Sequence, residues 1–146
     1  MRRVTNCILI DQDQVLLIKK PRRGWYSIPG GKMESGETIK EAVIREYYEE
    51  TSLRLQSPAL AGVFTFLVGS EEWMMFTFMC HEYEGNLTNH CEEGQLEWVS
   101  IHDLDQLPMA EGDRKIFSYI LEKKGLVTGA FTYTEEFELL DFRMER

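Results

Sequence analysis

The chain of 146 residues has few cysteines, few cations and no long apolar run. Its cysteines, Cys7, Cys80 and Cys91, are odd in number and form no Cys-x-x-Cys pair, which argues against a disulfide framework or a structural zinc site. No apolar stretch approaches the ~18 residues needed to cross a bilayer, and no signal-peptide core follows Met1. We therefore expect a protein of the reducing cytoplasm that does not enter a membrane.

Positive charge is the scarcer sign. The 25 Asp and Glu residues outnumber the 16 Lys and Arg residues, which gives a net charge of −9. A strongly negative protein repels the backbone of DNA or RNA, so we expect no long nucleic acid as a partner. A small phosphorylated ligand remains compatible with this charge, because a bound divalent cation can reverse its sign locally.

Length and composition favour one domain spanning residues 1–146, with 43% hydrophobic residues to build its core. Apolar and β-branched segments predict strands over 4–10, 15–19, 25–28, 60–68, 72–83, 96–100, 131–133 and 137–142. Amphipathic patterns predict helices over 39–51 and 113–124. Thr38 and Glu41 fit a capping box at the start of the first helix. The mixed order, without regular βαβ alternation, favours an α+β fold or a layered sandwich with a mixed sheet.

The helix predicted over residues 39–51 concentrates acidic side chains on one face. At about 100° per residue, Glu46, Glu49 and Glu50 share an arc of about 100°. Like charges at this spacing destabilise a helix by ~0.2–0.5 kcal/mol per pair, so a compensating partner is expected. A hard cation bound by oxygen ligands is one candidate. A solvated acidic face is the other, and the helix alone does not decide between them.

A tight, basic turn is predicted at Gly30-Gly31-Lys32, just before this helix. Glycine lets a backbone approach a phosphate or a metal ion closely, and lysine can neutralise a phosphate. Such a tripeptide is weak evidence by itself, because most are ordinary turns. Its significance depends on the spacing of the residues after it.

The residues from Gly31 onward have a known spacing. Gly31 is followed by five residues, Glu37, seven residues, Arg45-Glu46, two residues and Glu49-Glu50. This closely resembles the pattern GX5EX7REUXEEXGU of the Nudix hydrolases, in which U is apolar. The resemblance covers residues 31–53 and includes every charged position of the pattern.

Two positions depart from the pattern without removing a carboxylate. Tyr47 stands at an apolar position, and Ser52 replaces a glycine that would ease a left-handed helix end. Further segments resemble the MutT-type branch, the 8-oxo-dGTP diphosphatases: WYSIPGGK at 25–32, EEGQLEW at 92–98 and LPMAEGD at 107–113. The resemblance thus covers residues from about 4 to 121, and the segment after Gly125 matches no motif.

The resemblance implies a Nudix-like α/β/α sandwich with a mixed β-sheet, and a binding site for Mg²⁺, with Mn²⁺ as the alternative ion. The implied metal ligands are the carbonyl of Gly30 and the carboxylates of Glu46, Glu49, Glu50 and Glu93, with Glu92 as the alternative to Glu93. It also implies that Arg45 pairs with Glu37 to orient the glutamates, and that Glu46 is the general base.

The same resemblance implies the substrate contacts. Lys32 is expected to contact phosphate beside Gly31. Glu111 and Asp113 occupy positions where the MutT-type branch carries acidic or amide groups that read a purine edge. Trp25 could stack on a base, although an ordinary sheet or core aromatic explains it at least as well.

The implied activity is Mg²⁺-dependent hydrolysis of a nucleoside triphosphate to a monophosphate and pyrophosphate, as in the removal of 8-oxo-dGTP from the nucleotide pool. Alternatives are hydrolysis of another nucleoside diphosphate derivative or of an RNA 5′ end. A nucleotide sensor without catalysis is less compatible, because all the glutamates of the pattern are present. Monomer and homodimer both stay open, since an exposed C-terminal strand edge could pair with a second copy.

Overall fold

The computed structural model describes residues 1–21, 23–88 and 90–146. Its strands are β1 (Arg2–Asp11), β2 (Gln14–Lys19), β3 (Tyr26–Ser27), β4 (Gly30–Lys32), β5 (Arg54–Gln56), β6 (Ala59–Val68), β7 (Glu71–Cys80), β8 (Glu82–Glu84), β9 (His90–Cys91), β10 (Gly94–Ser100), β11 (Val127–Tyr133) and β12 (Leu139–Glu145). The helices are α1 (Ile39–Thr51), the 3₁₀ helix η1 (Ile101–Gln106) and α2 (Glu111–Leu121).

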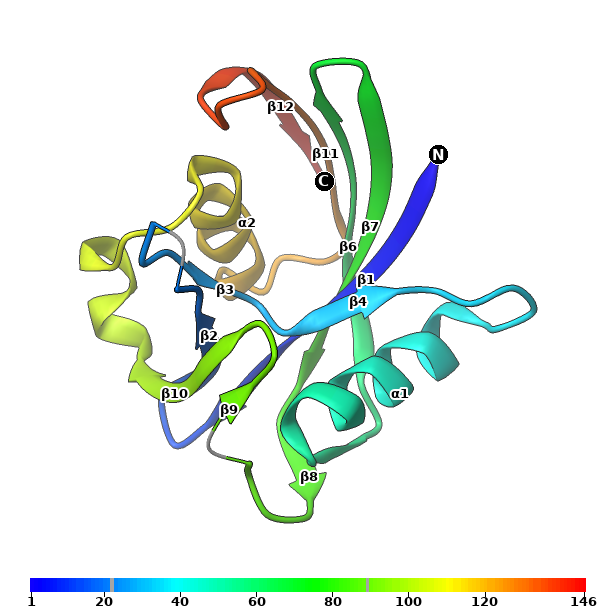
Figure 1. Cartoon of the computed structure of the whole chain (residues 1–146), viewed down its shortest axis with the longest axis vertical. Helices are drawn as coiled ribbons and strands as arrows, with labels where there is room; N and C mark the ends of the chain where they lie inside the picture. Colours follow the sequence, from blue (N-terminus) through cyan, green and yellow to red (C-terminus); the bar gives the residue numbers. More distant parts are fainter. Residues whose placement is uncertain (22, 89) are drawn as a thin grey trace.

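A mixed sheet in the order β12-β11-β6-β7-β1-β2-β10-β9 forms the middle of the molecule, and α1 and α2 lie on its two sides (Figure 1). Two buried apolar clusters reflect these layers. On one side, Ile116 and Phe117 of α2 pack against the sheet. On the other, Val43 and Tyr47 of α1 do so. The expected α/β/α sandwich with a mixed sheet is therefore confirmed.

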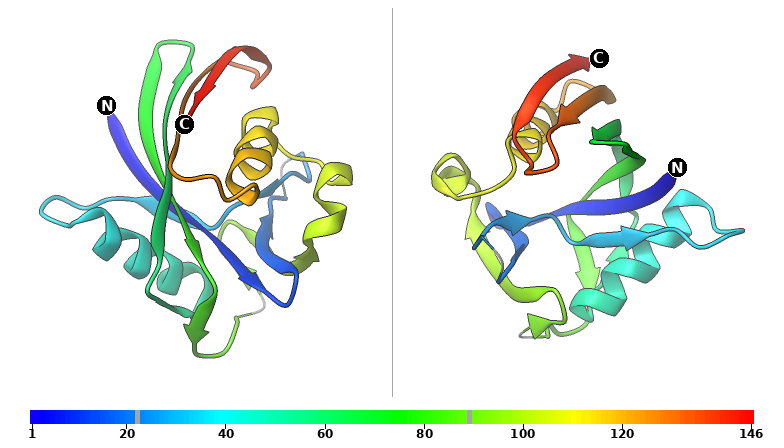
Figure 2. Two further views of the ribbon diagram at one scale, coloured as in Figure 1. Left: turned by 180° about the vertical axis from the view of Figure 1, so that it is seen from behind. Right: turned by 45° about the horizontal axis from the view of Figure 1, so that its top comes forward.

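Strand β1 connects the two halves of the sheet. It pairs in parallel with β7 from Arg2 to Leu9 and then antiparallel with β2 at Ile10 and Asp11. Figure 2 shows from behind how β1 runs from the side of β7 to the side of β2. Its side chains alternate between the two clusters, with Cys7 and Leu9 on the α1 side and Ile8 on the α2 side. Asn6 therefore faces the α2 side.

The structure confirms the main predicted elements and corrects several boundaries. Helix α1 spans the predicted 39–51, and Thr38 and Glu41 form the expected capping box. Helix α2 begins and ends earlier than the predicted 113–124. Its first turn holds Glu111 and Asp113, whose negative charge suits a helix N-terminus, and the left-handed Lys123 (φ 57°) follows its end.

The segment Gly30–Lys32 is not a turn but strand β4, which pairs antiparallel with Val4–Asn6 of β1. Gly30 lies so close to β1 that a Cβ placed on it would stand 2.0 Å from the carbonyl oxygen of Thr5. Only a residue without a side chain therefore lets β1 and β4 approach each other this closely. The strand predicted over 72–83 is likewise two strands, since β7 ends at Cys80 and β8 pairs with β5.

The C-terminal segment without a motif continues the sheet. Strand β11 pairs in parallel with β6, and β12 pairs antiparallel with β11 as the last strand of the path. The predicted closing β segment is confirmed. Within the described ranges, no helix is long and apolar enough to span a membrane.

Candidate active site

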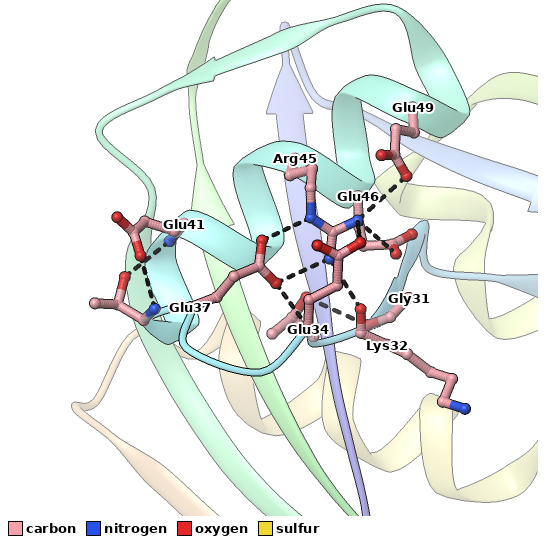
Figure 3. A network of polar contacts seen from close by, with 10 residues as sticks. Gly31, Lys32, Glu34, Glu37, Glu41, Arg45, Glu46 and Glu49 are labelled. Atoms are coloured by element: carbon pink, nitrogen blue, oxygen red, sulfur yellow. Dashed lines mark hydrogen bonds and ion pairs between the residues drawn. The ribbon is translucent and has the colours of Figure 1, made fainter.

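Arg45 lies at the centre of an ion-pair network on α1 (Figure 3). Its Nε and Nη2 donate to the two oxygens of Glu37 at 2.6 and 2.9 Å. Its Nη1 donates to Glu46 at 2.9 Å and to Glu49 at 3.2 Å, and Nη2 also donates to the carbonyl oxygen of Lys32 at 3.1 Å. This guanidinium therefore supplies the compensating charge that the acidic helix face requires.

Glu37 connects the loop before α1 to the helix itself. Besides the two bonds from Arg45, its Oε1 accepts a hydrogen bond of 2.7 Å from the backbone N–H of Glu34. The Arg45 guanidinium, followed by this N–H, holds the pKa of the Glu37 carboxyl at about 2. Glu37 is therefore ionised at neutral pH and keeps Arg45 in place.

Glu46 is packed tightly against β4. A Cβ placed on Gly31 would lie 2.2 Å from its Oε2, so only glycine leaves room for this carboxylate. Its other oxygen accepts the hydrogen bond from Arg45, and its side chain is 19% exposed. The hydrogen bond from Arg45 and the close approach of Gly31 thus fix the orientation of this carboxylate, which the sequence predicts as general base.

Glu50 is the most buried of the glutamates, with 9% of its surface exposed. Its Oε1 accepts a hydrogen bond of 2.7 Å from the backbone N–H of Gly30. Glu93 lies beside it and is paired with Lys20, whose Nζ stands 3.2 Å from Glu93 Oε2. Burial, reinforced by Glu93, raises the pKa of Glu50, while the hydrogen bond shared with Glu50 lowers the pKa of Glu93.

The predicted metal ligands meet in one hollow of about 560 Å³. It is lined by Glu46, Glu49, Glu50, Glu92 and Glu93 together with Ser52, Thr88 and Cys91. Glu93, and not Glu92, is the one that shares a hydrogen bond with Glu50, and the Gly30 backbone borders the same carboxylate. The sequence left Glu92 and Glu93 as alternatives, and this contact favours Glu93.

The donor set of this hollow suits a hard divalent cation, because its charged groups are all carboxylates. In the part of the chain that the structure describes, no three His, Cys, Asp or Glu side chains are gathered closely enough to hold an ion. The cause is visible in the contacts of the carboxylates. Arg45 engages Glu46 and Glu49, while Gly30 engages Glu50. A cation would therefore compete with Arg45 for Glu46 and Glu49, two of its predicted ligands.

Two adjoining hollows of about 380 and 400 Å³ lie beside the acidic one, and both are lined by Lys20, Ser27, Ala110, Asp113 and Phe137. The smaller also reaches Gly30, Gly31 and Glu93, which places it next to the acidic hollow. We call the two together the base pocket. Burial raises the pKa of Asp113, which lines both hollows, to about 6.

The predicted substrate contacts are only partly brought together. Trp25 lines the base pocket and lies under Arg23, whose guanidinium carbon stands 4.8 Å from the indole ring. Glu111 is exposed and pairs with Arg114 on α2 at 3.5 Å, outside both lining sets. The exposed Lys32 side chain points away from the Arg45 network (Figure 3).

Sequence reasoning missed several residues of the base pocket. Lys20 lies between the acidic hollow and the base pocket, and Tyr133 and Phe137 come from the C-terminal segment that matched no motif. Asn6 was included only as part of a strand. An amide within a mostly apolar predicted strand was the available signal, since a polar side chain among core residues needs a partner.

Comparison with known proteins gives concordant results. The family model of the NUDIX domain matches residues 1–120. The uncharacterized Nudix hydrolase YvcI of Bacillus subtilis is 50% identical, over 99% of this chain and 95% of its own length. The oxidized purine nucleoside triphosphate hydrolase of Mus musculus is 28% identical, over 97% of this chain and 94% of its own length.

Solved structures show the same likeness. The MutT protein from Bacillus halodurans superposes with a TM-score of 0.95 at 48% identity, and the match covers 99% of this chain and 98% of that one. The superposition includes the C-terminal strands, which lie beyond the 120 residues matched by the family model.

Proposed function

The chain belongs to the Nudix hydrolase family, and from this premise we propose that it hydrolyses a nucleoside triphosphate to a monophosphate and pyrophosphate with Mg²⁺. Members of this family act on phosphoric anhydride bonds and generally use divalent metal ions. The observation that carries the proposal is the junction at Glu93, where an acidic hollow meets a pocket of about 380 Å³ with aromatic walls. A charged phosphate chain and a flat base require such neighbouring environments.

Glu46, Glu49, Glu50 and Glu93 would hold the metal ion, with the Gly30 backbone next to them. A bound Mg²⁺ would neutralise phosphate oxygens and lower the pKa of an attacking water. Glu46 would accept the proton of that water, and the hydrogen bond from Arg45 and the close approach of Gly31 to its carboxylate support this role. Lys20 adds a positive charge between the two hollows, where the phosphate chain would pass.

An oxidised guanine nucleotide is the substrate we favour within this class. The mouse relative, similar along nearly the whole chain, is named for oxidized purine nucleoside triphosphates. The pocket also offers Asp113, which is mostly ionised above a pH of about 6 and can then accept hydrogen bonds from a purine edge. We treat residues 1–146 as one domain, because β11 pairs with β6 and supplies Tyr133 to the pocket.

A nucleotide panel with Mg²⁺ tests the proposal. We expect pyrophosphate release from 8-oxo-dGTP above that from dGTP and CTP, and little turnover of ADP-ribose or 5′-triphosphate RNA. Preference for ADP-ribose or RNA would replace the proposed substrate class by the alternative one. Tight nucleotide binding without any release would instead indicate a sensor.

The variant Glu46→Gln separates catalysis from binding. It should lower kcat by at least ~100-fold, because it removes the general base while keeping the shape of the side chain. Its thermal unfolding should match that of the wild type. Turnover close to the wild-type rate would remove Glu46 from the mechanism and leave the substrate class to the panel.

A further inference from the structure

Asn6 lines the base pocket and carries a buried hydrogen-bonding atom without a partner in the described part of the chain. It lies on β1, is 7% exposed and lines the smaller hollow. Its Nδ2 donates to the sulfur of Met75 at 3.2 Å. Its Oδ1 is buried and has no hydrogen-bond partner among residues 1–21, 23–88 and 90–146. A buried amide oxygen without a partner is costly, so it requires an explanation.

The backbone around Asn6 leaves this side chain little freedom. In the sheet, Asn6 is paired with Gly30 of β4 on one side and with Thr77 of β7 on the other. A Cβ placed on Gly30 would lie 2.7 Å from the Cβ of Asn6, so β4 is packed directly against it. The amide is therefore held at a fixed place on the floor of the pocket, next to the backbone that contacts Glu50.

Several apolar side chains share the hollow with this amide. Val4, Phe66, Trp73 and Met75 line the same hollow. The hydroxyl of Tyr133 is already engaged, because it accepts the N–H of Gly112. A ligand ring in this hollow would thus lie near the amide of Asn6, whose oxygen has no partner among the described residues, and near the carboxylate of Asp113.

We propose that Asn6 is a specificity-determining residue, whose amide oxygen accepts a hydrogen bond from the base of the substrate and favours a guanine-type edge. This inference rests on the proposed function and names the base that the pocket selects. Guanine carries two adjacent donors, N1–H and the 2-amino group, whereas adenine, cytosine and thymine carry one donor group each on that edge. A pocket with two acceptors, Asn6 and Asp113, pairs fully only with the guanine-type edge.

Binding of nucleoside monophosphates in the presence of EDTA tests the inference without hydrolysis or metal. The fluorescence of Trp73, in the wall of the hollow, reports the occupancy. For the wild type we expect dGMP to bind at least fivefold more tightly than dAMP or dCMP. In Asn6→Leu, affinity for dGMP should fall about tenfold, because an apolar group leaves the base donor unpaired. Affinity for dCMP should change less than twofold.

Asn86→Leu is the matched control, because it makes the same change at an exposed asparagine outside both hollows of the base pocket. It should keep the preference for dGMP. Asn6→Ala is the second variant should the leucine disturb folding, and it should show the same selective loss. Thermal unfolding of Asn6→Leu should be no lower than that of the wild type, because the change removes an unpaired polar atom.

The outcomes separate this inference from the proposed function. An unchanged dGMP preference in Asn6→Leu and Asn6→Ala, equal losses for every nucleotide, or a wild type without preference would overturn the role of Asn6. A wild type that prefers dGMP but releases no pyrophosphate from any triphosphate would overturn the proposed reaction and leave the base selection standing.

Discussion

The guanidinium of Arg45 is bound to the carboxylate of Glu37 by two parallel hydrogen bonds, 2.6 Å from Nε to Oε2 and 2.9 Å from Nη2 to Oε1. This fork fixes the plane of Arg45, and Nη1 consequently points at Glu46 and Glu49. Glu37 therefore acts on the candidate metal site indirectly, because its ion pair with Arg45 determines where Glu46 and Glu49 lie.

Arg45→Lys tests this positioning. Lysine keeps the charge but cannot form the fork, so the glutamates lose their common anchor. We expect kcat/KM to fall about 10–100-fold and the Mg²⁺ concentration for half-maximal rate to rise. Glu34→Gln is the control, because Glu34 lies 3.8 Å from Arg45 and its side chain is 68% exposed, and its rate should stay within twofold. Equal losses in both variants would contradict a specific role for the fork.

The negative charge of Glu50 is unfavourable in its buried position, and a cation bound beside it would relieve this cost. Burial and the nearby Glu93 raise its pKa, so its charged form is disfavoured in the folded state. Glu50→Gln keeps an acceptor for the Gly30 N–H and removes the charge. In EDTA it should raise the unfolding temperature by about 3 °C, the equivalent of about 1 kcal/mol. The further rise produced by Mg²⁺ should shrink.

Glu92→Gln is the matched control for Glu50→Gln, since Glu92 lines the same hollow and is exposed. It should leave both the unfolding temperature in EDTA and the Mg²⁺-induced rise almost unchanged. If Glu50→Gln kept the full Mg²⁺-induced rise, Glu50 would not be a metal ligand.

Ser52 ends α1 in a left-handed conformation, with φ 67° and its N–H bonded to the carbonyl of Tyr48. This is the position at which the family pattern has glycine. A residue with a side chain costs about 1–2 kcal/mol in this region, and glycine avoids that cost. Part of the gain is lost again, because glycine has more conformational freedom in the unfolded chain. Ser52→Gly should therefore raise the free energy of unfolding by about 0.5–1 kcal/mol in urea titrations. Ser35→Gly, at an exposed serine outside the left-handed region, should give no gain.

Local signals explain what the sequence predicted well. Helix α1 is correct to the residue because its capping box and its left-handed end lie within the helix and its neighbours. The ion pair of Arg45 and Glu37 followed from the family pattern, whose spacing places both residues on the same short loop and helix. Glu46, Glu49 and Glu50 share one hollow because they lie on one face of α1.

The parts that were missed depend on distant pairings. The strand character of Gly30–Lys32 depends on its pairing with β1, more than 20 residues away, and no local feature reveals that partner. The contact of Lys20 with Glu93 spans 73 residues. The side of the sheet on which Asn6 lies depends on how β1 pairs with the distant strand β7. That its amide oxygen lacks a partner among the residues that the structure describes can therefore be recognised only in the folded chain.

Asp113 makes stability depend on pH. Burial raises its pKa in the folded protein from the ordinary value of 3.8 to about 6, so ionisation above that pH destabilises the folded state. Asp113→Asn should be more stable than the wild type at pH 8, by up to about 3 kcal/mol, and the difference should vanish as the pH falls from 6 towards 4. Urea titrations at pH 8, 6 and 4.5 measure this. Asp141→Asn, at an exposed position of β12, should show no such trend.

Gly30 and Gly31 are neighbours that should fail in different ways when a methyl group is added. On Gly30, the new Cβ would stand 2.0 Å from the backbone oxygen of Thr5, which cannot move without breaking the pairing of β1 and β4. Gly30→Ala should thus lower the free energy of unfolding by about 3 kcal/mol, as expected for severe overpacking. Loss of activity would result from loss of the folded state.

On Gly31, the new Cβ would stand 2.2 Å from Oε2 of Glu46, the end of a side chain that can turn away. The free energy of unfolding of Gly31→Ala should therefore stay within about 1 kcal/mol of the wild type. Its kcat should nevertheless fall about 100-fold, because the carboxylate proposed as general base would be displaced by about 1 Å from its water. Urea titration beside a rate measurement separates the two effects. If Gly31→Ala turned over substrate at the wild-type rate, the orientation of Glu46 against β4 would have no part in catalysis. If it were as unstable as Gly30→Ala, the glycine would serve the fold alone.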